Sequence, residues 1–332
     1  MDREQQELQF LGFFGIFKHS FKIVFSWRKI FSQITLTLIL PLSFVFLFHF
    51  QVSHLLFHKV IEDQHDLNRH SNTTTSREKL SHMVSADWAG FWLFKAAYLT
   101  VFLILSLLST AAVVYTIACI YTAKQITFKK VMSVVPRVWK RLVITFIWSF
   151  AVALVYNLVA VGVFVLWAVA LGFSPIGITI FVVLLILYIA GFLYIKIVWN
   201  LASVVSVLED IYGWKAMVKS RCLIKGKLRV SIGLFIVIGL CYGVIQVVFE
   251  NFVVFGVAPS LAIWLVIGLI CFLFLLKVML LELVIQTVLY FVCKSYHHES
   301  IDMSALSDHL EVFLGNYVPL RAKNVQLEEC HV

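Results

Sequence analysis

Three charged residues inside otherwise apolar stretches are the first candidates for chemistry: Lys196, Lys277 and Glu282. A charge within a bilayer is costly, so such residues mark ion or proton paths or pair with one another. We expect Glu282, together with Asn200 and Glu209, to pair with Lys196 or Lys277 near the inner interface, where lysine side chains also reach the headgroups. An ion path is the alternative, but no interrupted helix or pair of midplane carboxylates indicates one.

Histidines gather in residues 49–82, where His54 and His58 lie four residues apart and Glu62 follows. On a helix this spacing places the side chains on one face, where they could bind a metal or sense an acidic compartment; a solvated loop is the alternative. The His-His-Glu sequence at 297–299 lacks HExxH spacing, and no hydrolase, Walker or dinucleotide-binding motif is present. We therefore predict no catalytic, cofactor-binding or metal-binding residues, and a protein that is not an enzyme.

The composition identifies the elements that must position these residues. The chain has 332 residues, of which 61% are hydrophobic and 14% charged, and such values exclude an ordinary soluble domain. Six stretches are long and apolar enough to cross a bilayer, which predicts an all-α polytopic membrane protein with three hairpins. The predicted spans are residues 30–50 (with a kink at Pro41), 91–123, 142–171, 177–197, 230–255 and 260–292.

Charge placement predicts the orientation. Twenty lysines and arginines lie on the side of both termini, and four lie in the polar loop predicted at 51–90. By the positive-inside rule, the N-terminal segment 1–29 and the tail 293–332 are cytosolic. The loop then faces the lumen or the exterior, and Asn72 within it begins an N-glycosylation motif. These features predict residence in the endoplasmic reticulum, another endomembrane or the plasma membrane.

Each hairpin follows a basic, amphipathic segment. Valines 131, 134, 135 and 138 recur at helical spacing in one of them, and Trp214 and Val218 do so in another. We expect helices lying in the inner headgroup layer with cations toward anionic lipid, or segments that only determine topology. No RNA-binding motif accompanies the charge, so direct nucleic-acid binding is not expected. The cations predicted to meet lipid are Lys215, Lys219, Arg221, Lys225 and Lys227.

The three hairpins also share weak sequence similarity. Val113-Val114 recurs 91 positions later as Val204-Val205, and Ser206-Val207-Leu208 recurs 81 positions later as Thr287-Val288-Leu289. This pattern is typical of an internal repeat, although apolar sequences produce such matches readily. A GxxxG step at Gly239 and Gly243 predicts close helix packing, within the bundle or between two copies.

The polar tail contains one more amphipathic pattern. Four apolar residues at helical spacing predict a short helix that Gly315 ends. Its apolar face must be covered by the bundle, the membrane or a cytosolic protein, and we predict docking of a protein partner. The predicted docking residues are Leu306, Leu310, Phe313 and Leu314.

Two stretches of the chain are distinctive: residues 297–320 in the tail, which begin His297-His298-Glu299, and residues 204–227, which begin Val204-Val205. With them, nearly the whole chain resembles a plant family of six-span membrane proteins, and the similarity is most specific in the tail. Members of that family are often named polyadenylate-binding protein-binding protein. The bundle is also distantly similar to the membrane domain attached to some bacterial glycerophosphodiester phosphodiesterases, but the catalytic metal motif of those enzymes is absent.

These observations predict a non-catalytic multi-pass protein. The tail and the basic segments favour a membrane scaffold or adaptor. The alternative is a transporter or lipid-handling protein that uses the bundle interior near Lys196, Lys277 and Glu282.

Overall fold

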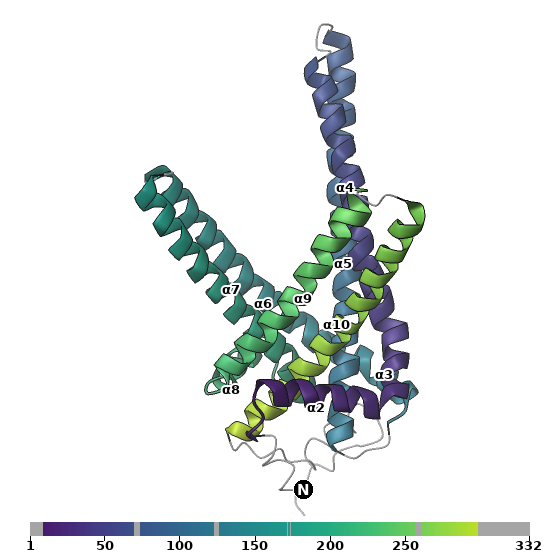
Figure 1. The fold of residues 1–332 in the computed structure, drawn as a ribbon, viewed down its shortest axis with the longest axis vertical. Coiled ribbons are helices and arrows are strands. Elements are labelled where there is room, and N and C mark those ends of the chain that lie inside the picture. Colours follow the sequence, from purple (N-terminus) through teal and green to yellow (C-terminus); the bar gives the residue numbers. More distant parts are fainter. Residues whose placement is uncertain are drawn as a thin grey trace, which may run out of the picture.

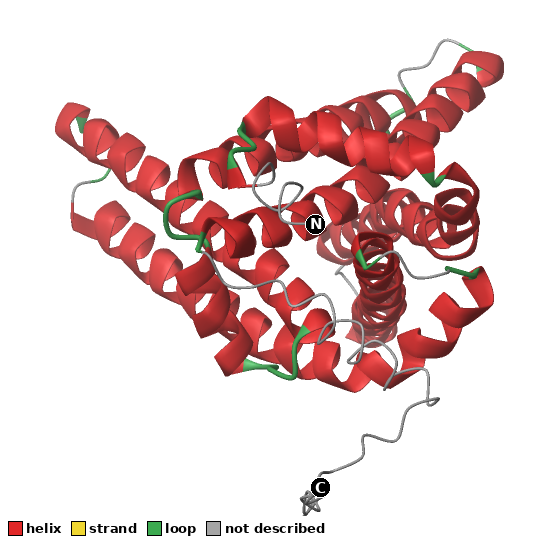
Figure 2. Cartoon of the chain, turned by 90° about the horizontal axis from the view of Figure 1, so that it is seen from below, coloured by secondary structure: helices red, strands yellow, loops and turns green. Residues whose placement is uncertain are grey.

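The computed structural model describes residues 9–69, 74–122, 126–170, 172, 174–256 and 260–297, with the side chains of 63–83 left out. Every element within these ranges is helical (Figures 1 and 2), and six helices are long and apolar enough to span a membrane. The prediction of an all-α, six-span protein is confirmed. The predicted tail helix with Leu306, Leu310, Phe313 and Leu314, and the glycosylation motif at Asn72, lie outside the described residues.

The first hairpin follows a short helix that lies across the bundle, α2 (Phe13–Ser26) (Figure 1). The hairpin consists of α3 (Arg28–Ile34), a π-helical turn η1 (Thr35–Ile39), α4 (Leu40–Arg69) and α5 (Thr74–Tyr121). The π turn ends two residues before Pro41, where the sequence predicts a kink. A proline has no backbone N–H to donate and crowds the preceding turn, so a locally widened helix is an expected response.

The remaining helices form two further hairpins. α6 (Phe128–Ala170) and α7 (Pro175–Leu208) form the second. A short helix α8 (Trp214–Leu223) leads to the third, which consists of α9 (Leu228–Phe249), the π turn η2 (Glu250–Val254) and α10 (Leu261–Tyr296). The Ser174 and Ser260 hydroxyls accept hydrogen bonds from Gly177 and Ile263 and thereby cap α7 and α10.

Two sequence predictions need correction. The segment 51–90 was predicted as a loop, but α4 and α5 continue through most of it as paired helices (Figure 1). The basic segment before the third span was predicted to lie in the headgroup layer, but it is the first part of α6, with Pro136 inside the helix. Its valines, including Val131 and Val138, are almost completely buried against the bundle. A buried helix face and an interfacial one have the same apolar spacing, which is why the pattern did not separate them.

The core lies at the base of the bundle, where the three hairpins meet. It consists of the last turns of α5, α7 and α10, in which residues 111–119, 284–293 and all of 201–208 except Ser203 are buried. These three helices contact one another. Farther from the base the hairpins diverge, and the α6/α7 pair points away from the others (Figure 1).

The arrangement of the base supports the internal repeat. The recurring residues at 113–114, 204–208 and 287–289 all fall in the three core segments. Each hairpin is also preceded by a helical segment that packs on the returning helix of another hairpin: α6 on α5, α8 on α7 and α2 on α10. The contact of α2 with α10 joins the beginning of the described chain to its end, so the three similar units form a closed ring.

Candidate functional site

A cavity of about 330 Å³ lies where the hairpins begin to diverge. Side chains of α5, α6, α7 and α10 line it. Its apolar walls include Phe146 and Trp199, whose rings meet edge to face with centroids 5.3 Å apart. The cavity is therefore formed by helices from all three hairpins and depends on how they are joined at the base.

Polar side chains enter this cavity from three helices at one-turn spacing. Ser106 and Thr110 come from α5, Asn200 and Ser203 from α7, and Glu282 and Gln286 from α10. Residues three or four apart share one helix face, so each of the three helices directs a pair of polar groups to the same space. A polar cluster within membrane-spanning helices is uncommon and is usually functional.

Glu282 is the anionic member of the cluster, and its charge is compensated. One carboxylate oxygen lies 3.5 Å from Nζ of Lys196, and the other accepts a hydrogen bond of 2.7 Å from the Tyr242 hydroxyl of α9. The Lys196 ammonium also lies 5.9 Å from the centre of the Tyr242 ring. The carboxylate and the ammonium together leave the polar side of the cavity close to neutral.

Asn200 and Gln286 give the cavity its remaining hydrogen-bonding capacity. The Asn200 Nδ2 atom is buried and has no hydrogen-bond partner among the described residues, and Gln286 is 4% exposed. An unpaired buried amide costs about 1–3 kcal/mol. A polar group that accepts from Asn200 would recover part of that free energy, so the site is suited to a ligand with a hydrogen-bond acceptor.

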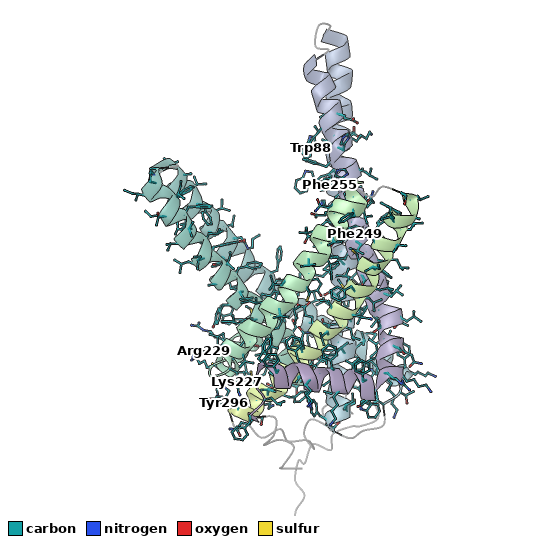
Figure 3. All side chains as sticks on the ribbon, viewed as in Figure 1. Trp88, Lys227, Arg229, Phe249, Phe255 and Tyr296 are labelled. Carbon is teal, nitrogen blue, oxygen red and sulfur yellow. The ribbon has the colours of Figure 1, made fainter. Side chains whose placement is uncertain are left out.

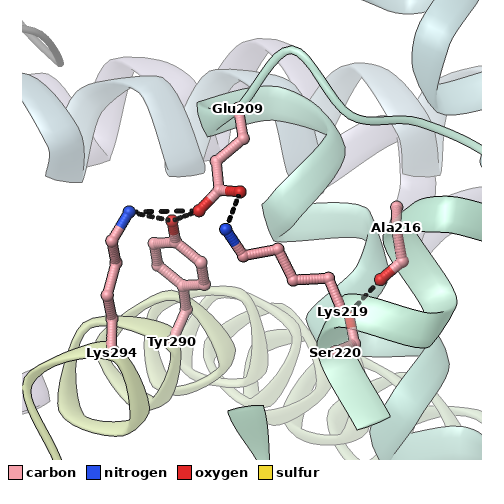
Figure 4. Close-up of polar contacts among 6 residues, drawn as sticks. All are labelled: Glu209, Ala216, Lys219, Ser220, Tyr290 and Lys294. Carbon is pink, nitrogen blue, oxygen red and sulfur yellow. Dashed lines mark hydrogen bonds and ion pairs between the residues drawn. The ribbon is translucent and has the colours of Figure 1, made fainter. Parts of the chain in front are cut away.

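A second polar cluster holds the base together, centred on Glu209 after the end of α7 (Figure 4). Its Oε1 accepts from the Tyr290 hydroxyl at 2.6 Å and from Lys294 Nζ at 3.1 Å, and its Oε2 lies 2.6 Å from Lys219 Nζ of α8. Burial acts to raise the pKa of Glu209, but hydrogen bonds from Lys219 and Tyr290 and the charge of Lys294 outweigh it and lower the pKa. The cluster thus connects α7, α8 and α10 through one ionised carboxylate.

The structure brings together only part of the predicted charge group. Lys196 and Glu282 pair as expected, whereas Glu209 pairs with Lys219 and Lys294 instead, and Asn200 pairs with neither lysine. Lys277 is exposed on α10 and has no ion pair within the described part of the chain.

The predicted lipid-facing cations divide into two groups. Lys215, Arg221 and Lys225 are exposed, but Lys219 binds Glu209, and Lys227 lies over the ring of Tyr296 at 5.2 Å. Lys227 and Tyr296 lie together at the base, and Arg229 lies nearby (Figure 3). Two of the five cations thus contact protein groups.

The structure also describes two other predicted features, the GxxxG step of α9 and the histidines His54 and His58. A methyl group added at Gly239 or Gly243 would meet no atom within 4 Å, so the predicted close packing at this step does not occur within the described chain. Among the histidines, the rings of His54 and His58 lie 6.3 Å apart and His58 is 3.5 Å from Glu62. No three His, Cys, Asp or Glu side chains converge as metal ligands in the ranges that the structure describes.

Comparison with known proteins gives one family. A family profile described as Domain of unknown function (DUF8558) matches residues 1–330. The chain belongs to this family. No curated protein and no solved structure matches it. The resemblance to plant six-span proteins and to phosphodiesterase membrane domains therefore stays a prediction.

Sequence reasoning missed the tyrosines that complete both clusters, Tyr242 and Tyr290, as well as Gln286. Tyrosines in apolar helices are common, so their type alone gave no indication. The repeat contained one clue: Tyr290 follows Glu209 by 81 positions, the repeat interval, and the two residues are hydrogen-bonded. Glu209 and Tyr290 thus occupy equivalent positions of the second and third units and meet at the base.

Proposed function

We propose that this protein binds a membrane amphiphile in the cavity between its hairpins and acts as a non-catalytic lipid-handling protein. The observation that carries the proposal is the cavity itself, in which polar groups from α5, α7 and α10 converge beneath apolar walls. Its volume of about 330 Å³ lies within the range of known small-molecule sites. This cavity supports the lipid-handling alternative predicted from the sequence.

The depth of the polar groups fits an amphiphile. Glu282 lies 21 residues after Leu261, the first residue of α10, and at 1.5 Å per residue this is on the order of 30 Å, about the thickness of the hydrocarbon core. The polar groups would then lie near the headgroups of one leaflet, while the apolar walls extend toward the bilayer centre. The near-neutral pairing of Glu282 with Lys196 favours an uncharged polar end over a strongly anionic one.

We also propose that the base faces the cytosol of an endomembrane or plasma-membrane protein. Exposed cations gather there, including Lys215, Arg221 and Arg229, and the opposite end of the bundle carries aromatic residues such as Trp88, Phe249 and Phe255 (Figure 3). This distribution follows the positive-inside rule. The scaffold or adaptor function predicted from the tail depends on residues outside the described ranges and stays a prediction.

The proposal is tested by quantifying the lipids that copurify in mild detergent by mass spectrometry. Asn200→Leu removes an amide that faces the cavity, and Leu99→Trp fills the cavity from a position that is itself exposed. Asn157→Leu is the matched control, because Asn157 is an intramembrane amide that bonds Tyr188 outside the cavity.

We expect Asn200→Leu to reduce the retained amphiphile about tenfold, because the loss of a hydrogen bond worth about 1.4 kcal/mol weakens binding by that factor. Leu99→Trp should remove it, and Asn157→Leu should leave it unchanged. Equal lipid retention by all three variants would show that the cavity is not the binding site.

A further inference from the structure

A second, separate groove lies on another side of the base. It has a volume of about 380 Å³ and runs between the first helices of the chain and α10. Its lining includes Phe25 of α2, Arg28 and Phe31 of α3, Leu36 of η1, and Leu276 and Leu280 of α10. It is an apolar groove with a cation at its edge, and it shares no lining residue with the cavity described above.

The π turn η1 shapes one wall of this groove. The Leu40 N–H bonds the Thr35 carbonyl, five residues earlier, so the helix is wider here than an α-helix. Thr35 lines the groove, and its hydroxyl oxygen is buried without a hydrogen-bond partner among the described residues. Single π turns occur frequently at functional sites. The wall of the groove thus contains both a π turn and an unpaired hydroxyl.

The helices before the first span carry charge of one sign. Residues 9–50 contain Lys18, Lys22, Arg28 and Lys29 but no aspartate or glutamate. Lys277, next to the groove residue Leu276, is exposed as well, and neither it nor Arg28 has an ion pair within the described part of the chain. Phe14, Phe21 and Phe25 of α2 are exposed beside the lysines, the composition of a helix that lies in an interface with anionic lipid.

We propose that this groove binds one acyl chain of an anionic phospholipid, whose phosphate lies between Arg28 and Lys277. The apolar walls accept the chain, and the cations balance the phosphate. Lys277 lies 16 residues after the first residue of α10, or about 24 Å along the helix. A lysine side chain at that depth extends to the phosphate layer. This proposal is independent of the proposed function of the cavity.

The test is native mass spectrometry of the full chain in detergent, titrated with phosphatidylglycerol or with phosphatidylcholine of identical acyl chains. We expect a roughly thirtyfold preference for phosphatidylglycerol, the equivalent of about 2 kcal/mol for two interfacial cations. Arg28→Gln combined with Lys277→Gln should abolish the preference. Lys130→Gln combined with Lys140→Gln removes the same charge from exposed positions on α6 and should preserve it.

A third variant, Leu36→Trp, distinguishes a lipid in the groove from an anion on the surface. Leu36 is 66% exposed, so the substitution fills the groove without disturbing the core. Phosphatidylglycerol binding should be lost in this variant if an acyl chain occupies the groove. Unchanged binding in Leu36→Trp, or an equal loss of preference in both double variants, would overturn the proposal.

Discussion

Neutralising Glu209 tests whether the base is held together as the structure indicates. Glu209→Gln keeps the size of the side chain and removes its charge. The variant leaves the ammonium groups of Lys219 and Lys294 near each other without the carboxylate that both contact. Glu209 follows α7 of the second hairpin, whereas the two cations come from α8 and α10, so the substitution weakens the connection between the second and third hairpins.

The expected loss of stability in Glu209→Gln follows from the burial of the three charged side chains. The side chains of Glu209, Lys219 and Lys294 are 13%, 26% and 18% exposed, and removing one partner of a buried ion pair costs about 3–5 kcal/mol. Residual solvent access favours the lower value, about 3 kcal/mol. At about 2 °C per kcal/mol for a large domain, the melting temperature should fall by about 6 °C.

The neighbouring residue provides the control. Asp210 is 72% exposed and pairs with Arg141 at 2.8 Å, and an exposed pair contributes at most about 1 kcal/mol. Asp210→Asn should therefore lower the melting temperature by no more than about 2 °C, measured by differential scanning fluorimetry in the same detergent. Equal melting temperatures for the two variants would refute the reasoning that burial makes Glu209 structurally important.

Two further predictions follow from the described geometry. Because folding lowers the pKa of Glu209, the stabilisation that its carboxylate gives the protein is complete above the ordinary pKa of 4.5 and is lost as pH falls through the lowered pKa. The melting-temperature difference between wild type and Glu209→Gln should therefore shrink on acidification. A difference that grows would contradict a lowered pKa of Glu209. Gly226 and Gly256 both have positive φ, but a methyl group at Gly226 would collide with the Tyr296 ring whereas one at Gly256 meets nothing within 4 Å. Gly226→Ala should therefore be less stable than Gly256→Ala by about 2 kcal/mol in unfolding experiments, and equal stability would show that Tyr296 moves aside freely.

The sequence predicted the membrane-spanning helices well because their length and composition are local properties. The kink was likewise predicted from a single residue, Pro41, and the π turn η1 lies next to it. The helices in 51–90 were missed because their polar residues show no apolar period. There α4 and α5 run as a pair, and such pairing cannot be recognised from either segment alone.

The sites were less predictable because they depend on contacts between distant residues. Lys196 and Glu282 were identified by charge, and their pairing agreed with the expectation. Two partners of Glu209, Tyr290 and Lys294, lie 81 and 85 positions away on α10, and only the packing of α7 on α10 brings them together with it. Lys277 was grouped with Glu282 because both were placed at a similar depth near the inner interface, yet five residues on a helix correspond to a rotation of about 140°, away from the same face.

The central claim is that an amphiphile occupies the cavity between the hairpins. The most direct test is an experimental structure of the protein purified with native lipid and reconstituted in a lipid nanodisc. We predict density for an amphiphile whose polar end contacts Asn200 and Gln286 and whose apolar part lies against Phe146 and Trp199. A structure in which α6 and α7 close against α5 and α10, so that these side chains fill the cavity themselves, would contradict the account.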